Sequence, residues 1–495
     1  MSRFGLIGPS YQSESVIADC QRTINLYVES IESGEGIGQF ALYPTPGLSL
    51  FASGTDRPVR GFTEINGRLF IVIGSVFYES NSAGVLTSRG TVINDGLPVS
   101  IAASPIQVLI ASGGAAYVFD ATANTFTQLN PALFVGPVSF VGFMDGFFIA
   151  LIAGTNQFQL SAPEDATSWD LTVVTGVSVF SDNVLGMLVD HRQLWLWGPH
   201  EFVVYFDSGA QFFPFEVIPG GFGETGISAP RSTVQLDNSV LWLGADIRGG
   251  AIAYKAAGYS PLRISNHAVE REWSTYKTTT DAVGYSYQEA GHSFYVIFFP
   301  TANKTWVFDV AVGMWHERDH FDPTTATSTA HLSQCHIYSF GKHLVGDWNS
   351  GNVYVMAIDT LTDNGGPIRR VRRAPHISVE NEWIFFYRLT LHLEVGLGPQ
   401  PPLLDGLGNP RGPQITLRMS RDGSKTWGPE HVRDCGQAGN YKKRVIWRRL
   451  GKARDAVFEL VATDPIPWRL IECYLLANPV ATPQERLAKK YMNSM

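Results

Sequence analysis

The residues of this chain that could do chemistry are scattered carboxylates. Glycoside hydrolysis needs two carboxylates that face each other across the bond to be cleaved. Glu164, Asp165, Asp170, Glu270 and Glu272 are candidates by residue type only, because their spacing places no two of them face to face. Carboxylates in turns are more often solvated or bonded to turn amides. The sequence therefore favours a protein that is not an enzyme, with a glycosidase as the weaker alternative.

One cluster has residue types that bind metals. It contains His331, Cys335, His336 and His343. In an extended strand the neighbours Cys335 and His336 point to opposite faces, so they cannot easily share one ion. The chain has no glycine-rich phosphate loop and no Gly-x-Ser-x-Gly elbow. We therefore expect neither a metal nor a cofactor.

The most distinctive local motif runs from Ser420 to Trp427 and resembles the Asp-box hairpin of sialidases and other β proteins. In such a hairpin the aspartate, here Asp422, accepts turn amides, and the tryptophan packs beneath the turn. The motif is imperfect because Ser424 replaces its later glycine, and Gly423 stands one place earlier. We interpret it as an element of the fold.

Two basic stretches are candidates for contact with another molecule. They comprise Arg369, Arg370, Arg372 and Arg373, and then Lys442, Lys443, Arg444, Arg448 and Arg449. Such charges could meet DNA phosphates or the acidic surface of a neighbouring subunit, and the alternative is an ordinary solvated strand face. No recognition helix or aromatic stacking platform accompanies them, so sequence-specific reading of bases is not predicted.

The net charge of −8 conceals an asymmetry. Residues 1–366 contain 16 Lys and Arg against 33 Asp and Glu, whereas residues 367–495 contain 21 against 12. The body is therefore acidic and the C-terminal part basic, which predicts a domain boundary near Pro367. Opposite charges suit head-to-tail contacts between neighbouring subunits.

These residues must be positioned by short strands. A unit of about 40 to 55 residues recurs from Arg57 to Arg370, with a strand, a tight turn, a second strand and an aromatic-rich strand, as in propellers. Its second strand ends at Gly74, Gly113, Gly154, Gly198, Gly244, Pro300 and Gly346. The repeat predicts an all-β fold with a β-propeller of about seven blades.

The regions outside the repeat predict further elements. Longer alternating strands, such as 384–395 and 414–419, indicate a C-terminal β-sandwich domain. We expect an extended N-terminal segment (1–56), the propeller (57–370), the sandwich (371–480) and a C-terminal tail (481–495). The first segment, with a strand near Asn25, could complete the last blade and so remove an exposed sheet edge.

The cysteines and the apolar stretches narrow the class of protein. Cys20, Cys335, Cys435 and Cys473 are far apart, so neither a disulfide framework nor a zinc ribbon is predicted. No apolar stretch reaches the roughly 18 to 20 residues that span a bilayer, and the start lacks the pattern of an export signal. We expect a protein without a membrane span that folds in a reducing cytoplasm.

Several segments together resemble the tail hub proteins of short-tailed, tailspike-bearing phages, also called packaged-DNA stabilisation proteins. The resemblance covers most of the chain and includes residues 25–27 and 45–48, 237–244, 346–347 and 351–354. Its most specific part is the sequence from Arg263 to Glu270 followed by the stretch from Trp306 to Arg318.

The resemblance implies a structural virion protein of the phage tail, assembled in the host cytoplasm. Such a protein would form a ring, or nozzle, of six copies below the portal and its adaptor. It would extend the channel for double-stranded DNA, retain packaged DNA, and dock the tail needle and the tailspikes or fibres. The family supplies no catalytic residues. The alternative is a phage adhesin that binds host glycan through aromatic residues such as Trp195, Trp197 and Trp242.

Overall fold

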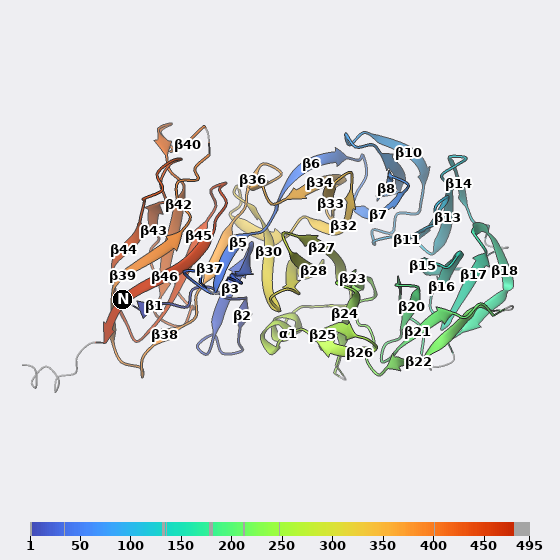
Figure 1. Cartoon of the computed structure of the whole chain (residues 1–495), viewed down its shortest axis with the longest axis horizontal. Coiled ribbons are helices and arrows are strands. Elements are labelled where there is room, and N and C mark those ends of the chain that lie inside the picture. The colour runs from blue at the N-terminus through green and yellow to red at the C-terminus, as the bar shows by residue number, and fades with distance from the viewer. Residues whose placement is uncertain are drawn as a thin grey trace, which may run out of the picture.

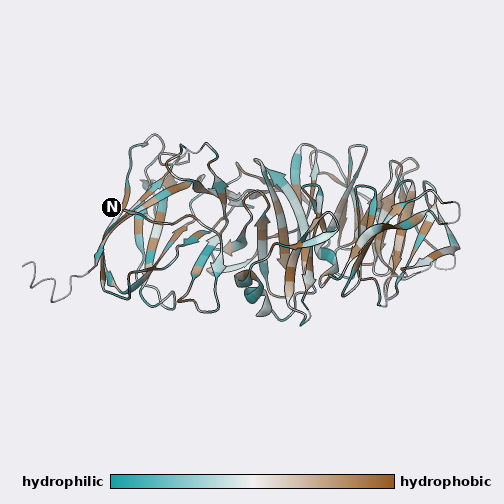
Figure 2. Cartoon of the chain, turned by 60° about the horizontal axis from the view of Figure 1, so that its bottom comes forward, coloured by the Kyte–Doolittle hydropathy of each residue, from teal (hydrophilic) through white to brown (hydrophobic). Residues whose placement is uncertain are grey.

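The chain forms a disc of β-sheet blades at one end and a two-sheet sandwich at the other (Figure 1). A computed structural model describes residues 2–33, 35–130, 134, 136–177, 182–210, 213–246, 248–399 and 401–479. The C-terminal tail expected at 481–495 lies outside these residues. Brown hydrophobic segments interspersed with teal hydrophilic ones mark the strands of both parts (Figure 2).

Five four-stranded antiparallel sheets follow one another along the first half of the chain. Blade 1 contains β7 (Val59–Ile65), β8 (Arg68–Ile73), β9 (Val76–Ser80) and β10 (Leu86–Thr91). Blade 2 contains β11 (Ser100–Ala103), β12 (Gln107–Ser112), β13 (Ala115–Asp120) and β14 (Thr125–Gln128). Blade 3 contains β15 (Val138–Met144), β16 (Phe147–Ile152), β17 (Gln157–Ala162) and β18 (Asp165–Gly176). Blade 4 contains β19 (Gly186–Asp190), β20 (Gln193–Trp197), β21 (Phe202–Asp207) and β22 (Phe215–Gly223). Blade 5 contains β23 (Val234–Leu236), β24 (Ser239–Ala245), β25 (Ala251–Ala257) and β26 (Ser260–Arg263).

Two further blades complete the disc. Blade 6 contains β27 (Val283–Glu289), β28 (His292–Phe299), β29 (Lys304–Asp309) and β30 (Met314–Asp322), with β31 (Thr327–Ala330) beside β30. Blade 7 contains β32 (Ser333–Ser339), β33 (Lys342–Asp347) and β34 (Asn352–Ala357). A short 3-10 helix, η1 (Pro230–Ser232), precedes blade 5, and α1 (His267–Ser274) follows it. Among the described residues seven blades are thus present, which confirms the predicted propeller.

The fourth strand of blade 7 comes from the beginning of the chain. β6 (Gly47–Ser53) pairs antiparallel with β34, so that Leu48 lies opposite Met356. β35 (Thr362–Asp363) and β36 (Gly366–Pro367) extend the same sheet beyond β6. Because β7 of blade 1 follows β6 directly, this pairing ties the first blade to the last and closes the disc.

Local turn chemistry explains why the repeat can be recognised in the sequence. Asn66 and Gly67 both have positive φ, 48° and 77°, and so have Asp145 and Gly146, 51° and 89°. Tight turns of this hand match the twist of the strands on either side, and Asn-Gly and Asp-Gly favour them. The hairpins between the first and second strands of blades 1 and 3 are therefore encoded locally.

The sandwich combines strands from both ends of the chain. One sheet has the order β4 (Leu26–Ser30), β5 (Phe40–Pro44), β46 (Leu470–Pro479), β39 (Ile384–Leu393) and β44 (Val445–Ala453), with β1 (Ser2–Arg3) beside β46. The other has the order β3 (Cys20–Ile24), β37 (Arg370–Arg373), β45 (Asp455–Ala462), β42 (Gln414–Ser420) and β43 (His431–Asp434). β2 (Tyr11–Gln12) lies beside β3, β38 (Ile377–Ser378) lies beside β45, and β40 (Leu403–Leu404) pairs with β41 (Pro410–Arg411). Leu26, Leu42 and Trp447 share the core between the sheets.

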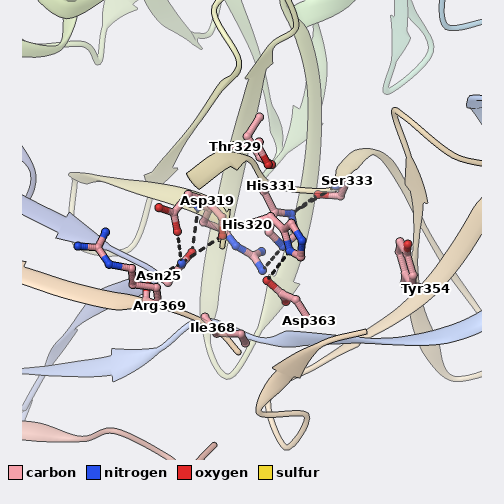
Figure 3. A network of polar contacts seen from close by, with 12 residues as sticks. Asn25, Asp319, His320, Thr329, His331, Ser333, Tyr354, Asp363, Ile368 and Arg369 are labelled. Carbon is pink, nitrogen blue, oxygen red and sulfur yellow. Dashed lines mark hydrogen bonds and ion pairs between the residues drawn. The ribbon is translucent and has the colours of Figure 1, made fainter. Parts of the chain in front are cut away.

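The sheet of blade 6 continues into the sandwich. β3 pairs in parallel with β30 at Ile24 and Glu317, and antiparallel with β37 on its other edge. Beside this joint, the Asn25 side chain donates hydrogen bonds to the carbonyls of Asp319 (3.1 Å) and Arg369 (2.9 Å) (Figure 3). The N-terminal strand β3 and the neighbouring Asn25 therefore join the two domains. The later strand β6 belongs to blade 7.

Candidate partner-binding face

The first basic stretch, residues 369–373, does not lie exposed on the surface. Arg370 and Arg372 alternate along β37 and so share one face of the strand, where they are 1% and 0% exposed. They cannot contact DNA or a neighbouring subunit from this position, and the sequence-based expectation for these two residues is corrected. A run of basic residues is a poor guide to exposure, because the fold can enclose arginine side chains.

Arg372 instead fastens the N-terminal segment. Its guanidinium donates to the Leu6 carbonyl, to the Pro9 carbonyl (3.0 Å), to Thr23 Oγ1 (2.9 Å) and to Gln21 Oε1 (2.6 Å). Burial lowers the pKa of Arg372 to about 9, so the group is still protonated at neutral pH. It is a buried cation that carbonyl and side-chain oxygens surround.

Arg373 belongs to a second packed cluster. Its Nε donates to Glu459 Oε2 at 2.8 Å, and Arg418 Nε donates to the other oxygen, Oε1, at 2.8 Å. Both guanidinium groups lie over the ring of Trp427, at 4.9 and 5.1 Å. Burial opposes ionisation of Glu459, but the two arginines hold its pKa below the ordinary value. Trp427 of the Asp-box-like hairpin therefore supports the fold. Arg369 is partly buried, with its guanidinium 5.9 Å from the Phe321 ring centre.

The second basic stretch is mostly exposed. Lys442, Arg444, Arg448 and Arg449 are exposed, and none of the four forms an ion pair with a residue that the structure describes. Lys443 alone is paired, with its Nζ 2.8 Å from Asp434 Oδ2. These side chains are available to a partner.

Exposed aromatic residues lie beside these charges. Along β39 the residues Ile384, Phe386 and Leu389 enter the sandwich core, while the alternate residues point outward. Phe385 and Tyr387 are outward-facing and are 38% and 47% exposed, and Trp383 just before the strand is 39% exposed. Large apolar side chains at the solvent face of a strand are characteristic of binding surfaces when they occur together.

The strand register places cations next to these rings. Phe385 lies opposite Lys452, and Arg388 lies opposite Arg448 on β44. The Lys452 ammonium and the Arg454 guanidinium also lie over the Trp383 ring, at 4.9 and 5.2 Å. We call this surface the basic–aromatic face; it consists of Trp383, Phe385, Tyr387, Arg388, Arg448, Arg449 and Lys452.

A hollow of about 360 Å³ adjoins the basic–aromatic face. Its lining includes Arg388, His392, Lys442, Arg444 and Tyr474, and contains no carboxylate. At its wall, the buried Thr390 Oγ1 has no hydrogen-bond partner among the described residues. The hollow therefore suits an acidic or otherwise anionic group.

The aromatic half of this face was missed in the sequence. Strand 384–395 was identified by its alternation, and the outward positions of that alternation hold Phe385 and Tyr387 where a solvated face would hold polar residues. Aromatic residues at outward strand positions are therefore the sequence signal for this binding face.

The carboxylates considered for glycosidase chemistry do not come together. Glu164 and Asp165 lie at the turn between β17 and β18, and Asp170 lies on β18 of blade 3. Glu270 and Glu272 lie on α1, and Glu270 accepts a 2.7 Å hydrogen bond from Arg263 Nε. Blade 3 and α1 occupy different parts of the disc (Figure 1).

The histidine cluster is dispersed in a similar way. His331 is buried and bonded to Ser333 Oγ (2.6 Å), whereas His336 and His343 contact each other at 3.0 Å. Among the residues that the structure describes, no group of three or more His, Cys, Asp and Glu side chains could hold a metal ion. The described residues also contain no helix with the length and apolar character that a membrane span requires.

Comparison with known proteins identifies the family. The family described as "Bacteriophage P22 Gp10, beta-propeller" matches residues 20–361, and "Bacteriophage P22 Gp10, beta-sandwich" matches residues 369–477. No curated protein matches the chain.

Solved structures show distant likeness to the chain. The N-terminal domain of Nup159 is 11% identical with a TM-score of 0.38, and covers 68% of this chain and 98% of its own. The designed protein Ika8 is 10% identical with a TM-score of 0.38, and covers 72% of this chain and 98% of its own. The extracellular domain of BT4673 from B. thetaiotaomicron is 9% identical with a TM-score of 0.43, and covers 77% of this chain and 47% of its own.

Proposed function

This chain belongs to the bacteriophage P22 Gp10 family of phage tail structural proteins, and from that premise we propose that it forms the hub ring of a phage tail. In this proposal six copies form a nozzle below the portal and its adaptor. The ring extends the channel for double-stranded DNA and retains packaged DNA. It also docks the tail needle and the tailspikes or fibres, after assembly in the host cytoplasm.

The observation that carries the proposal is the basic–aromatic face on a rigidly attached domain. A closed ring requires each copy to hold its contact surfaces at a fixed angle. The continuous sheet from β30 through β3 to β37 holds the sandwich against blade 6. Exposed Trp, Tyr and Arg side chains are the residue types that dominate protein–protein binding energies.

Passage of DNA agrees with the charge of the propeller. Residues 1–366 contain 33 acidic against 16 basic residues. A surface of this sign repels phosphates, so DNA would pass without tight, sequence-independent binding.

The test is the native mass of the full chain, alone and with a portal–adaptor complex of a short-tailed phage. We expect six copies on each portal–adaptor complex. A chain that stays monomeric and never joins that complex would contradict the proposal.

Neither alternative function gains support from the structure. Trp195, Trp197 and Trp242 are 3%, 0% and 0% exposed, and the rings of Trp197 and Trp242 pack 5.8 Å apart between blades 4 and 5. They cannot stack on a glycan, because core residues cover them. The five carboxylates considered for a glycosidase are divided between blade 3 and α1, so they do not form one acid–base set.

A further inference from the structure

The folded molecule carries charges of opposite sign at its two ends. Residues 90–230 contain 12 aspartates and glutamates and a single basic residue, Arg192. These residues build blades 2 to 4, which lie at the end of the disc farthest from the sandwich (Figure 1). The sandwich end has a smaller excess of the opposite sign, since residues 2–44 and 367–479, which build it, contain 20 Lys and Arg against 16 Asp and Glu. The molecule is therefore an elongated body with one acidic and one basic end.

The acidic end has exposed groups on the outermost strands of its blades. In blade 4, β22 presents the exposed Glu216, and the exposed Glu224 follows the strand directly. Neither forms an ion pair among the described residues, although Glu216 accepts a 3.0 Å hydrogen bond from Ser208. Phe222 between them is 60% exposed. We call Glu216, Phe222 and Glu224 the acidic rim.

The acidic rim and the basic–aromatic face are complementary in two respects. The rim offers carboxylates, and the face offers Arg448, Arg449 and Lys452, which form no ion pair with any residue that the structure describes. The rim also offers one exposed phenylalanine, and the face offers Phe385 and Tyr387. A contact that combines apolar burial with opposite charge is the usual composition of a specific interface.

We propose that the basic–aromatic face of one copy binds the acidic rim of the next copy. This inference rests on the proposed ring and names the surfaces that form it. The two surfaces lie at opposite ends of the elongated molecule, so the contact is head to tail and repeats from copy to copy. Such a heterologous contact closes into a ring when its rotation permits.

Charge reversal on either surface tests the contact. The face variant carries Arg448→Glu and Lys452→Glu, and the rim variant carries Glu216→Lys and Glu224→Lys. Each variant alone then presents like charges across every contact. We expect the concentration of chain needed for half assembly on a portal–adaptor complex to rise on the order of tenfold or more, because repulsion replaces attraction.

Mixing the two variants gives the sharpest readout. A face variant has two acidic surfaces and a rim variant has two basic ones, so each is complementary to the other at both ends. An equimolar mixture should assemble again into rings that contain equal numbers of the two variants in native mass spectra. This composition requires an even number of subunits, as in a hexamer.

Two single substitutions serve as controls. Lys425→Glu and Glu64→Lys change exposed residues elsewhere on the sandwich and the propeller, and should leave assembly unchanged. Thermal unfolding of every variant checks that folding is intact.

Three outcomes would overturn the inference. Rings that form normally from both variants place the contact elsewhere and leave the proposed ring intact. A defect in the face variant that the mixture does not restore assigns the face to another partner. Normal rings that lose retention of double-stranded DNA in the face variant assign the face to DNA. If the unmodified chain forms no ring with the portal–adaptor complex, the proposed function itself fails.

Discussion

His292 of blade 6 and Glu29 of the sandwich meet across the joint between the two domains, with Nε2 2.9 Å from the Glu29 carboxylate. The other ring nitrogen, Nδ1, lies 2.6 Å from Asp309. The hydrogen bond to Asp309, strengthened by Glu29 and only partly opposed by burial, raises the pKa of His292 to about 9. The imidazolium thus connects the domains at neutral pH.

This contact predicts a loss of stability in alkali. The folded-state pKa lies above the unfolded value, so the stabilisation is complete below about pH 6.5 and is lost as pH rises through about 9. It amounts to at most about 3 kcal/mol in the free energy of unfolding. Urea unfolding between pH 6 and pH 10 should show this decline, and His292→Gln should flatten it. An unchanged pH profile in the variant would contradict the assignment.

Arg372 should contribute to stability despite its place in a basic run. Arg372→Met removes donors to Pro9, Gln21 and Thr23 and leaves buried acceptors unpaired. We expect a loss of about 2 to 4 kcal/mol in the free energy of unfolding, together with faster proteolysis within residues 6–23. The exposed Arg448→Met is the matched control and should change stability by no more than about 0.5 kcal/mol. Equal effects in the two variants would show that Arg372 is not a structural residue.

Closure of the propeller by β6 gives a paired test on one strand. Leu48 is 0% exposed and packs in the core between blades 6 and 7, whereas Leu50 is 55% exposed. Leu48→Ala should cost about 2 to 4 kcal/mol because it opens a cavity. Leu50→Ala should cost almost nothing. Thermal unfolding of both variants, followed by the near-ultraviolet signal, measures the difference, and similar melting curves would argue against closure by β6.

The propeller could be predicted from the sequence because its signals are local. Turns such as Asn66-Gly67 and Asp145-Gly146 fix each hairpin by themselves. The sequence indicates that the segment 1–56 could complete the last blade, but not which of its strands does so, because β6 and its partner β34 are some three hundred residues apart and only tertiary packing brings them together. Of the strands in that segment, β6 lies in the last blade, whereas β4, the strand near Asn25, lies in the sandwich.

The candidate site was predictable only in part. The exposed residues from Lys442 to Arg449 are visible as a charge cluster in the sequence. Arg370 and Arg372 form an equally strong cluster but are buried, and the carbonyls of Leu6 and Pro9 that bind Arg372 are residues that the sequence cannot place beside it. Charge alone does not distinguish a cation on the surface from one that the fold encloses.

The aromatic part of the basic–aromatic face should affect assembly without affecting folding. Phe385 and Tyr387 are outward-facing, so Phe385→Ser with Tyr387→Ser removes apolar surface that water already contacts. The free energy of unfolding should change by no more than about 1 kcal/mol. Assembly on the portal–adaptor complex should nevertheless weaken on the order of tenfold, because buried aromatic residues contribute much of the binding energy of an interface. The control is Tyr338→Ser, which removes a 61% exposed aromatic residue from the propeller. Sedimentation of the assembled complex separates the two variants, and an equal effect of the control would show that general loss of surface aromatics, rather than this face, governs assembly.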